Sequence, residues 1–360
     1  GLWDIERIAV HGGPQSTSNG RNSIGGAVYM TTKAPTQDFE GAVRVGYKNQ
    51  DSYLDTAAVV SGALVEDVLA FRLSTQYVNG ETFSNPTVYE TNPTDKNLNN
   101  LNTSSTRAKL LYTPTTDLAV QLTYSTYSEE GNTGRKYYEG DKPFDYVPLF
   151  QRDMDTQSDT TQVNIDYKIN DNFSFDILLA YMDYDWGYEA YEALASAESD
   201  ISMDEKNITI DSKLNFGLNS EFYSGFVGIA YFDRDQDFES VGASDYFGDD
   251  SSDSKAIYGE TSFKLTNELT LTAGLRIERE EQLRNFDMAF GGSRLVEQLD
   301  NSNTIKLPTL AIQYKINNDT TLSASARRGY NAGGGALNFT AQEYYYYDQE
   351  SVNTYELGSR

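Results

Sequence analysis

Apolar and polar side chains alternate along most of this 360-residue chain. From Phe39 onward, segments of about ten residues carry an apolar side chain at every second position, as expected for a strand with one apolar face. The clearest segment is Leu269–Glu278, and Gln162–Ile169, Ser174–Tyr181 and Asn207–Phe216 follow the same rule. None of them repeats apolar residues at spacings of three and four. The pattern therefore predicts β-strands and no amphipathic helix.

The connections between these strands alternate in length. Short connections, rich in Asn, Asp, Gly and Pro as tight hairpins require, fall at Leu64–Asp67, Thr113–Asp117, Ile169–Asn172, Gly217–Glu221, Leu265–Glu268 and Ile316–Asp319. Long polar connections fall at Glu81–Thr103, Glu129–Ser158, Gly187–Asp204, Asp233–Asp253, Glu280–Asn303 and Asn331–Gln349. Only the first connection, around Asn49–Ser52, is short where a long one is expected. The alternation predicts a transmembrane β-barrel with tight turns at one end and long loops at the other.

Fourteen strands are expected from these signals. They are Phe39–Lys48, Tyr53–Ala63, Val68–Gly80, Ser105–Tyr112, Leu118–Ser128, Thr160–Lys168, Phe173–Trp186, Glu205–Phe216, Phe222–Phe232, Lys255–Leu265, Leu269–Arg279, Thr304–Lys315, Thr320–Tyr330 and Val352–Arg360. Proline cannot donate a ladder hydrogen bond, so we expect a bulge or the end of a ladder at Pro308.

Composition excludes several kinds of function. The formal net charge of −26 argues against nucleic acid, because phosphate binding needs clustered Lys and Arg. The chain has no cysteine, which excludes thiolate metal sites, Cys nucleophiles and disulfides. His11 is the only histidine, which leaves little room for a His-based metal site or a Ser-His-Asp triad. No apolar run approaches the roughly 20 residues of a transmembrane helix, while 27 Tyr and 17 Phe suit a barrel whose alternate residues face lipid.

The stretch from Glu6 to Pro35 is short, polar and rich in glycine. Its residues alone predict a turn at Gly12–Pro14 and a short strand after Gly25-Gly26. The stretch also resembles the closing segment of the plug domain in TonB-dependent outer-membrane receptors, which reads Arg-Ile-Glu-Val, Gly-Pro-Gln-Ser, Gly-Arg-Asn, Gly-Gly and Thr-Lys-x-Pro. The matching runs are Arg7–Val10, Gly13–Thr17, Gly20–Val28 and Thr32–Pro35, and the motif residues are Arg7, Gly13, Pro14, Gly20, Arg21, Gly25 and Gly26. The chain departs from the pattern at Ala9, where an acid is usual, and at His11-Gly12, where Leu-Arg is usual.

The tail extends the resemblance. Leu307–Leu310, Arg328–Gly334 and Ser351–Gly358 are similar to mid-barrel strands of siderophore-type receptors of this family. The resemblance implies an all-β fold, a transmembrane antiparallel β-barrel of about 22 strands, of which about 14 are present, with the C-terminal end of an N-terminal plug domain. Residues 1–37 would be the end of the plug. Residues 38–360 would be a partial barrel with long extracellular loops and short periplasmic turns, in a piece of a longer protein.

The implied function is active uptake of a ferric siderophore, or a similar large scarce nutrient, across the bacterial outer membrane. The implied partners are TonB with its inner-membrane energising complex, the ferric siderophore, and outer-membrane lipid and lipopolysaccharide. No enzyme activity and no cofactor is expected. The alternatives are a complete 14-strand passive porin or fatty-acid channel, a receptor of the same family for cobalamin, haem or oligosaccharide, and a surface adhesin or soluble β-rich binding module.

Candidate ligand-binding residues lie in two of the long connections. Arg135, Lys136, Tyr137 and Tyr138 join cationic and aromatic groups, which suits an anionic ferric chelate. In the run Tyr344–Tyr347, successive side chains of a strand point to opposite faces, so two of the four, Tyr345 and Tyr347, could face one ligand; an interfacial aromatic girdle is the alternative.

Two groups of charged residues have a functional interpretation and a simpler one, in which they are only solvated. Arg7, Arg21 and Lys33 could pair with wall carboxylates such as Glu260, Glu278 or Glu356, or those carboxylates could simply face water. The acidic run of Asp245, Asp249, Asp250 and Asp253 could hold calcium through oxygen ligands, or could be solvated. No metal-binding or catalytic residue is assigned.

Overall fold

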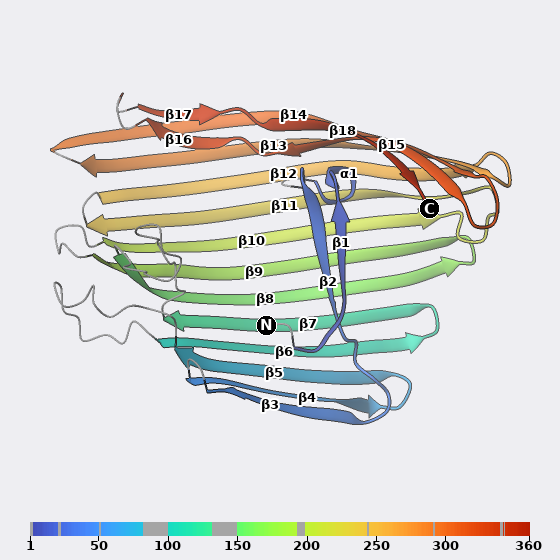
Figure 1. The fold of residues 1–360 in the computed structure, drawn as a ribbon, viewed down its shortest axis with the longest axis horizontal. Helices are drawn as coiled ribbons and strands as arrows, with labels where there is room; N and C mark the ends of the chain where they lie inside the picture. The colour runs from blue at the N-terminus through green and yellow to red at the C-terminus, as the bar shows by residue number, and fades with distance from the viewer. Residues whose placement is uncertain are drawn as a thin grey trace.

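The computed structural model describes residues 3–20, 23–49, 52–81, 100–131, 150–192, 199–242, 245–290, 292–338, 341 and 343–360 of the chain. Most of them form one antiparallel sheet of fourteen strands, called the wall below (Figure 1). Its strands are β3 (Glu40–Lys48), β4 (Tyr53–Val65), β5 (Leu69–Glu81), β6 (Asn100–Thr115), β7 (Leu118–Gly131), β8 (Phe150–Asn170), β9 (Phe173–Glu192), β10 (Ser199–Phe216), β11 (Tyr223–Gly242), β12 (Asp245–Lys264), β13 (Leu269–Phe290), β14 (Ser293–Lys315), β15 (Thr321–Asn331) and β18 (Glu350–Ser359). Neighbours in the wall follow chain order, so the predicted fourteen-strand meander is confirmed.

The wall is not closed on itself. β3 and β18, whose residues are all described, are its two edges and pair with one neighbour each. A complete 14-strand barrel needs those two edges paired, because closure is what removes unpaired backbone groups. This arrangement does not favour the alternative of a complete 14-strand channel.

Two smaller hairpins lie outside the wall. The N-terminal segment consists of β1 (Ile5–Gly12), the short helix α1 (Ser16–Asn19) and β2 (Gly26–Thr32), with β1 and β2 paired to each other (Figure 1). A second hairpin, β16 (Gly334–Asn338) with β17 (Glu343–Tyr347), follows β15. Within the described part of the chain, no helix has the length and apolar character needed to cross a membrane.

The turn end of the wall matches the sequence prediction closely. The loop end, where the wall strands lead into the longer connections, does not. Most residues of the predicted loops Gly187–Asp204, Asp233–Asp253 and Glu280–Asn303 are strand residues, and β13 continues to Phe290 instead of ending at Arg279. Predicted loops at Glu81–Thr103 and Glu129–Ser158 also lose residues to strands. The physical reason is that the backbone ladders continue through these extensions without an apolar outer face.

Pro308 lies where the sequence predicts. β14 pairs with β15 only from Thr309 onward, opposite Arg327, so Pro308 is just beyond the end of that ladder. On its other side Pro308 stands opposite Leu275 without a register shift. The expected end of a ladder is therefore confirmed.

The outer face of the wall carries a belt of exposed apolar side chains between two rows of aromatic residues. The row at the turn end includes Tyr112, Tyr167, Phe173, Tyr223, Phe263 and Tyr314, and the row toward the loop end includes Tyr77, Tyr124 and Tyr181. On β11 the belt runs from Tyr223 to Tyr231, about 27 Å along the strand at ~3.4 Å per residue. That span is comparable with the ~25 Å apolar band and flanking girdles of outer-membrane barrels.

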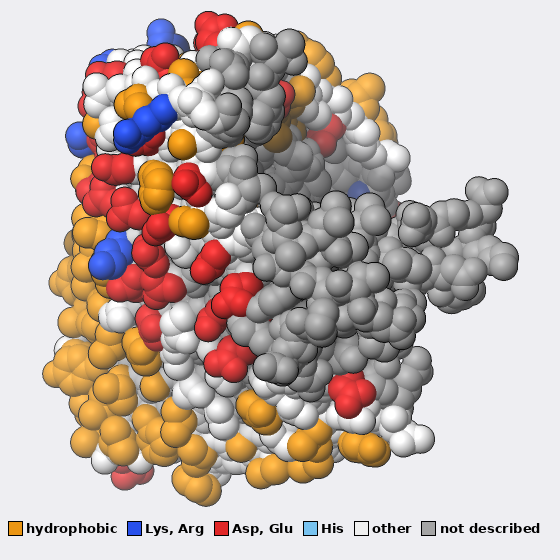
Figure 2. Space-filling view, turned by 90° about the vertical axis from the view of Figure 1, so that its left-hand side faces the viewer, with side chains coloured by type: hydrophobic (Ala, Val, Ile, Leu, Met, Phe, Trp, Pro, Cys, Tyr) orange, Lys and Arg blue, Asp and Glu red, His pale blue; other side chains and the backbone are white. Residues whose placement is uncertain are grey.

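Acidic side chains replace the belt toward the loop end. On β11 the outer positions after Tyr231 are Asp233, Asp235, Asp237 and Glu239. Seen from the loop end, a band of Asp and Glu side chains borders the hydrophobic side chains of the outer face (Figure 2). The change from apolar to acidic residues marks the end of the apolar belt on the side of the loops.

Candidate functional site

The inner face of the wall is the face against which the N-terminal segment lies. Trp3 donates a hydrogen bond from Nε1 to the Ala58 carbonyl of β4 at 3.1 Å, and Thr17 donates one to the Leu307 carbonyl of β14 at 3.1 Å. The segment therefore spans from β4 to β14 across the inner face. Because side chains alternate along a strand, the wall side chains that contact the segment, such as Arg72 of β5, identify which positions face inward.

A buried ion pair fixes the start of the N-terminal segment to the wall. Arg72 of β5 donates to both carboxylate oxygens of Asp4, at 2.5 and 2.8 Å, and its third contact is Glu40 at 2.6 Å. The Arg72 and Asp4 side chains are only 3 % and 4 % exposed. Lys109 of β6 adds hydrogen bonds from Nζ to the carbonyls of Thr32 and Lys33. The wall therefore supplies cations and the N-terminal segment supplies the acceptors.

The ion pairs expected from the sequence, in which the N-terminal segment supplied the cations, stay a prediction. Glu278, one of the expected wall partners, accepts hydrogen bonds from two residues of the wall, from Arg276 at 2.5 Å and from Tyr330 at 2.8 Å. Arg7 lies on β1 with an exposed side chain, and Arg21 is outside the described residues.

The motif residues of the N-terminal segment meet the wall around Glu278. Gly20, just after α1, has φ +75°, and a Cβ there would lie 2.8 Å from the Arg276 guanidinium and 3.0 Å from the Glu278 carboxylate. Glycine fits both the backbone conformation and the close approach. Pro14, just after β1, is buried against Gly329 of β15. A Cβ added at Gly329 would lie 2.7 Å from the Pro14 ring. Gly13 follows β1, Gly25 precedes β2 and Gly26 begins it.

A polar cavity of about 730 Å³ lies beside α1 on the inner face. Its lining includes Ser18 of α1 and the wall residues Asp211, Lys213 and Arg276. The Tyr258 hydroxyl donates to Asp211 at 2.6 Å, and Arg276 lies over the Tyr258 ring at 5.0 Å. Acids and cations thus alternate across the inner face at the level of the N-terminal segment.

Aromatic side chains line the inner face nearer the loop end. Phe238 of β11, Tyr246 of β12, Phe286 of β13 and Tyr344 of β17, called the aromatic row below, form a continuous series of ring contacts. The ring centroids are 5.0 Å apart for Phe238 and Tyr246, 4.8 Å for Tyr246 and Phe286, and 4.0 Å for Phe286 and Tyr344. The last two rings are stacked, with 13° between their planes. Such a surface offers apolar area and π-faces to a ligand.

Charged groups stand directly below the aromatic row. Arg284 on β13 contacts Asp250 on β12 at 3.0 Å, and these two residues are opposite each other in register. Burial raises the pKa of Asp250, and Arg284 partly opposes that rise. Burial also raises the pKa of Tyr246 to about 12, so its hydroxyl remains protonated at neutral pH. The site therefore combines neutral aromatic hydroxyls with a cation and an acid just below them.

The structure describes two of the six ligand-binding residues predicted from the sequence. Tyr345 and Tyr347 lie on β17 and are 45 % and 46 % exposed, while Tyr344 on the opposite face is buried. The predicted alternation of the tyrosine run is thus confirmed, and contact of Tyr345 and Tyr347 with a ligand stays a prediction. Arg135, Lys136, Tyr137 and Tyr138 lie outside the described residues. The sequence prediction missed Phe238, Tyr246 and Phe286, because it placed them in loops.

The acidic run on β12 does not converge on a metal site. Asp249 and Asp250 are consecutive residues of a strand, so Asp249 points outward while Asp250 contacts Arg284. Across the residues that the structure describes, no group of three His, Asp or Glu side chains is arranged to hold a metal ion. The hypothesis of calcium binding by this run therefore finds no support in the described residues.

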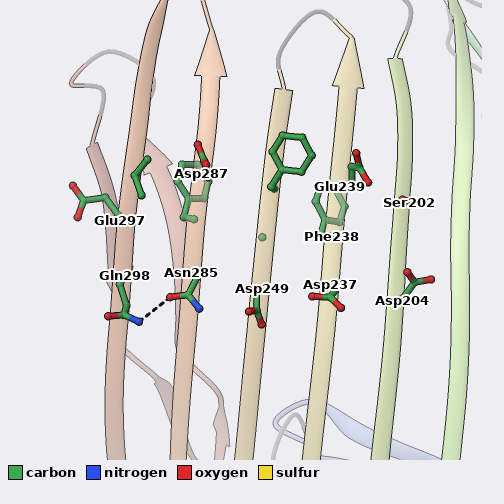
Figure 3. Close-up of a pocket in the computed structure, with 14 residues that line it drawn as sticks. Ser202, Asp204, Asp237, Phe238, Glu239, Asp249, Asn285, Asp287, Glu297 and Gln298 are labelled. Atoms are coloured by element: carbon green, nitrogen blue, oxygen red, sulfur yellow. Dashed lines mark hydrogen bonds between the residues drawn. The ribbon is translucent and has the colours of Figure 1, made fainter.

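The outer face carries a row of aspartates at the height of the Arg284–Asp250 pair. Asp185, Asp204, Asp237 and Asp249 stand opposite one another on β9 to β12. Figure 3 shows the last three of them in line with Asn285 and Gln298, along a cavity of about 760 Å³. The Asp204 carboxylate shares a hydrogen bond with Asp185 and raises the pKa of that carboxyl group. Like charges opposite each other destabilise a sheet, and the raised pKa of Asp185 reflects that repulsion together with the hydrogen bond.

Comparisons with known proteins agree with this architecture. The ferric yersiniabactin uptake receptor FyuA from Yersinia pestis superposes with a TM-score of 0.85 at 16 % identity, and the match covers 99 % of this chain and 57 % of that one. The siderophore receptor PiuA from Acinetobacter baumannii gives a TM-score of 0.77 at 14 % identity, covering 99 % and 60 %. The alcaligin outer-membrane receptor FauA from Bordetella pertussis gives 0.69 at 16 %, covering 98 % and 53 %. The chain thus spans between half and two thirds of these structures, and at such identities the likeness concerns the fold.

A family model settles the relationship at the level of sequence. The model described as "TonB dependent receptor-like, beta-barrel" matches residues 92–360, which is most of the chain and includes all but the first strands of the wall. The fourteen antiparallel strands, in chain order and with the N-terminal segment on their inner face, fit this family's barrel. The chain therefore belongs to the TonB-dependent receptor family.

Proposed function

We propose that this protein carries out TonB-dependent active uptake of a ferric siderophore, or of a similarly large and scarce nutrient, across the bacterial outer membrane. The loop end faces the outside of the cell, residues 1–37 are the end of the plug, and residues 38–360 form part of the barrel. The working partners are TonB with its inner-membrane energising complex, the ferric chelate, and outer-membrane lipid with lipopolysaccharide. The protein acts as a transporter and not as an enzyme.

The observation that carries the proposal is the aromatic row on the inner face at the loop end. It stands where a ligand entering from the loops would first meet the wall, above the N-terminal segment that crosses the interior. Aromatic faces beside Arg284 suit a ferric chelate, which is bulky, ring-bearing and often anionic. The solved structures that the chain resembles are named as receptors for ferric yersiniabactin, a siderophore and alcaligin.

The apolar belt favours a membrane protein over an adhesin or a soluble binding module. A soluble sheet of this size would cover the exposed apolar faces of β9 to β13 with another layer, whereas lipid covers them here. Receptors of the same family for cobalamin, haem or oligosaccharide remain the second candidate. The ring stacking of Phe286 favours a cargo with aromatic groups over an oligosaccharide lacking them.

The test is iron uptake by cells that depend on the full-length receptor. Radioactive iron would be offered as complexes with 2,3-dihydroxybenzoate or acetohydroxamate, in the presence and absence of TonB. We expect saturable uptake that requires TonB. Phe286→Ala should lower uptake of the aryl complex about tenfold, since a stacked pair contributes ~0.5–1.5 kcal/mol beyond its buried area and ~1.4 kcal/mol is a factor of ten.

The matched control is Phe247→Ala. Phe247 lies on β12 close to the height of Phe286 but points to the outer face, where it is exposed. Its replacement should leave uptake unchanged. Uptake that persists without TonB would contradict active transport, and equal losses in both variants would contradict a role for the inner face.

A further inference from the structure

The β16–β17 hairpin covers the aromatic row, yet its backbone is not part of the wall. Its two strands form a separate sheet. Its contacts with the wall include the stack of Tyr344 on Phe286 and a hydrogen bond from the Tyr346 hydroxyl to Gln282. Leu337 of the hairpin also packs on the cluster of Phe286 and Met288. Side-chain contacts of this kind can be exchanged for those of a ligand without breaking the ladders of the wall.

The Tyr344 ring fills a slot whose thickness is that of one ring. Phe286 forms one side, at a centroid distance of 4.0 Å. The backbone of Gly335 on β16 forms the other, because a Cβ added there would lie 2.0 Å from the Tyr344 hydroxyl oxygen and 2.4 Å from Cζ. The slot is closed off well enough that Phe286 is 5 % exposed and Met288 6 %.

The chemistry around the slot is suited to a hydroxylated aromatic ring. Burial raises the pKa of the Tyr344 hydroxyl, while the guanidinium of Arg284 acts in the opposite direction. A cation is thus near enough to interact with an oxygen substituent on whatever ring occupies the slot. Met288 and Leu337 supply the apolar packing around the ring.

We propose that the slot between Phe286 and Gly335 is a binding site for a planar aryl group of the cargo, with Tyr344 as its resident occupant and the β16–β17 hairpin as its cover. This inference rests on the proposed uptake function and adds the class of cargo group and the way the site is kept closed. An incoming aryl group takes the place of Tyr344 on Phe286, so the hairpin must leave the wall. Cargo without an aryl group has nothing to place in the slot and gains nothing from opening it.

The first experiment tests the slot without any iron complex. The full-length receptor with Tyr344→Ala would be titrated calorimetrically with p-cresol, which is the Tyr side chain as a free molecule. We expect p-cresol to bind Tyr344→Ala, to bind wild type at least tenfold more weakly, and to lose binding when Phe286→Ala is added. Failure of p-cresol to bind Tyr344→Ala, or equal binding by wild type, would overturn the proposal.

The second experiment asks whether the cargo uses the same slot. Affinities for the iron complexes of 2,3-dihydroxybenzoate and acetohydroxamate would be compared in Tyr344→Ala, which empties the slot, in Gly335→Ala, whose Cβ would enter the slot, and in the outer-face control Phe247→Ala. Tyr344→Ala should bind the aryl complex about tenfold more tightly, as expected if the slot is open in about one tenth of wild-type molecules. Gly335→Ala should gain nothing, because its Cβ narrows the slot for any ring.

The acetohydroxamate complex should bind all four proteins alike. Unchanged or weaker binding of the aryl complex in Tyr344→Ala would overturn the role of Tyr344 as a competitor of the cargo. If p-cresol binds as expected while cells take up neither complex, the slot stands and the proposed uptake of ferric chelates fails. The two proposals can thus fail separately.

Discussion

The buried contact between Arg72 and Asp4 should dominate the attachment of the N-terminal segment to the wall. Arg72→Met removes the cation but keeps a side chain of similar length, and it leaves the Asp4 carboxylate buried without that partner. Removing one member of a buried ion pair costs about 3–5 kcal/mol. Because Asp4 and Arg72 are 4 % and 3 % exposed, solvent screening cannot absorb this cost. We therefore expect the segment to open more readily by this amount.

Hydrogen exchange of the β1 and β2 amides, followed by mass spectrometry on the full-length receptor, measures that opening. A change of 3–5 kcal/mol corresponds to a loss of about two to three and a half orders of magnitude in protection, at ~1.4 kcal/mol per factor of ten. The wall amides of β9 to β13 should keep their protection, because their ladders do not contact Asp4.

Two further variants separate the ion pair from a general loss of packing. Adding Asp4→Asn to Arg72→Met removes the unpaired carboxylate of Asp4, and Asn is suited to the positive φ of 61° at this position. Most of the hydrogen-exchange protection of β1 and β2 should therefore return. Lys168→Met breaks a solvent-exposed pair with Asp171 and should leave the protection of β1 and β2 unchanged. Protection that is unchanged in Arg72→Met, or lower in the double variant than in the single one, would refute this reasoning.

Three other substitutions test separate parts of the fold. Gly20→Ala should destabilise the receptor by about 1–3 kcal/mol in urea unfolding from lipid vesicles, because its φ of +75° disfavours a Cβ that would also press on Arg276. Leu307→Ala should cost about 2–5 kcal/mol in the same assay, because Leu307 is completely buried. The pKa of Asp185 is raised by Asp204, so this pair favours folding below the ordinary Asp pKa and loses that contribution as pH rises through the raised value. Asp204→Asn should therefore raise the melting temperature at neutral pH, and the gain should shrink as the pH falls toward about 4.

The sequence was sufficient to predict the part of the wall that carries the apolar belt. There, one face of each strand is apolar and the other polar, and the tight turns carry Asn, Asp and Gly, so both signals agree. The ends at Ile169–Asn172 and Leu265–Glu268 are accordingly within a few residues of the observed turns. Pro308 was informative for the same reason, because its missing donor is a local property that needs no tertiary information.

The loop-end extensions and the aromatic row could not be read from apolar alternation. Beyond the belt, the outer face carries acids, and the search for apolar residues at every second position misses such strands. A different alternation was present on β11, where Asp233, Asp235, Asp237 and Glu239 occupy every second position. That spacing would have predicted a strand and would have placed Phe238 on the face opposite to the acids. The packing of Tyr344 on Phe286 had no local signal, because it joins residues that are far apart in the chain.

The alternation of β11 also explains how the wall presents acids on its outer face and aromatic residues on its inner face at the loop end. Its odd positions from 233 to 239 carry carboxylates outward, while Phe238 and its even-numbered neighbours line the interior. A slip of one residue in the pairing of β11 with β12 would exchange the two sets. It would bring four carboxylates into the interior beside Asp250 and expose Phe238 on the outside. The pairing of Asp237 with Asp249 on the outer face and the ring contact of Phe238 with Tyr246 on the inner face therefore depend on a single register, so the acids of the outer face help to fix where the aromatic row stands.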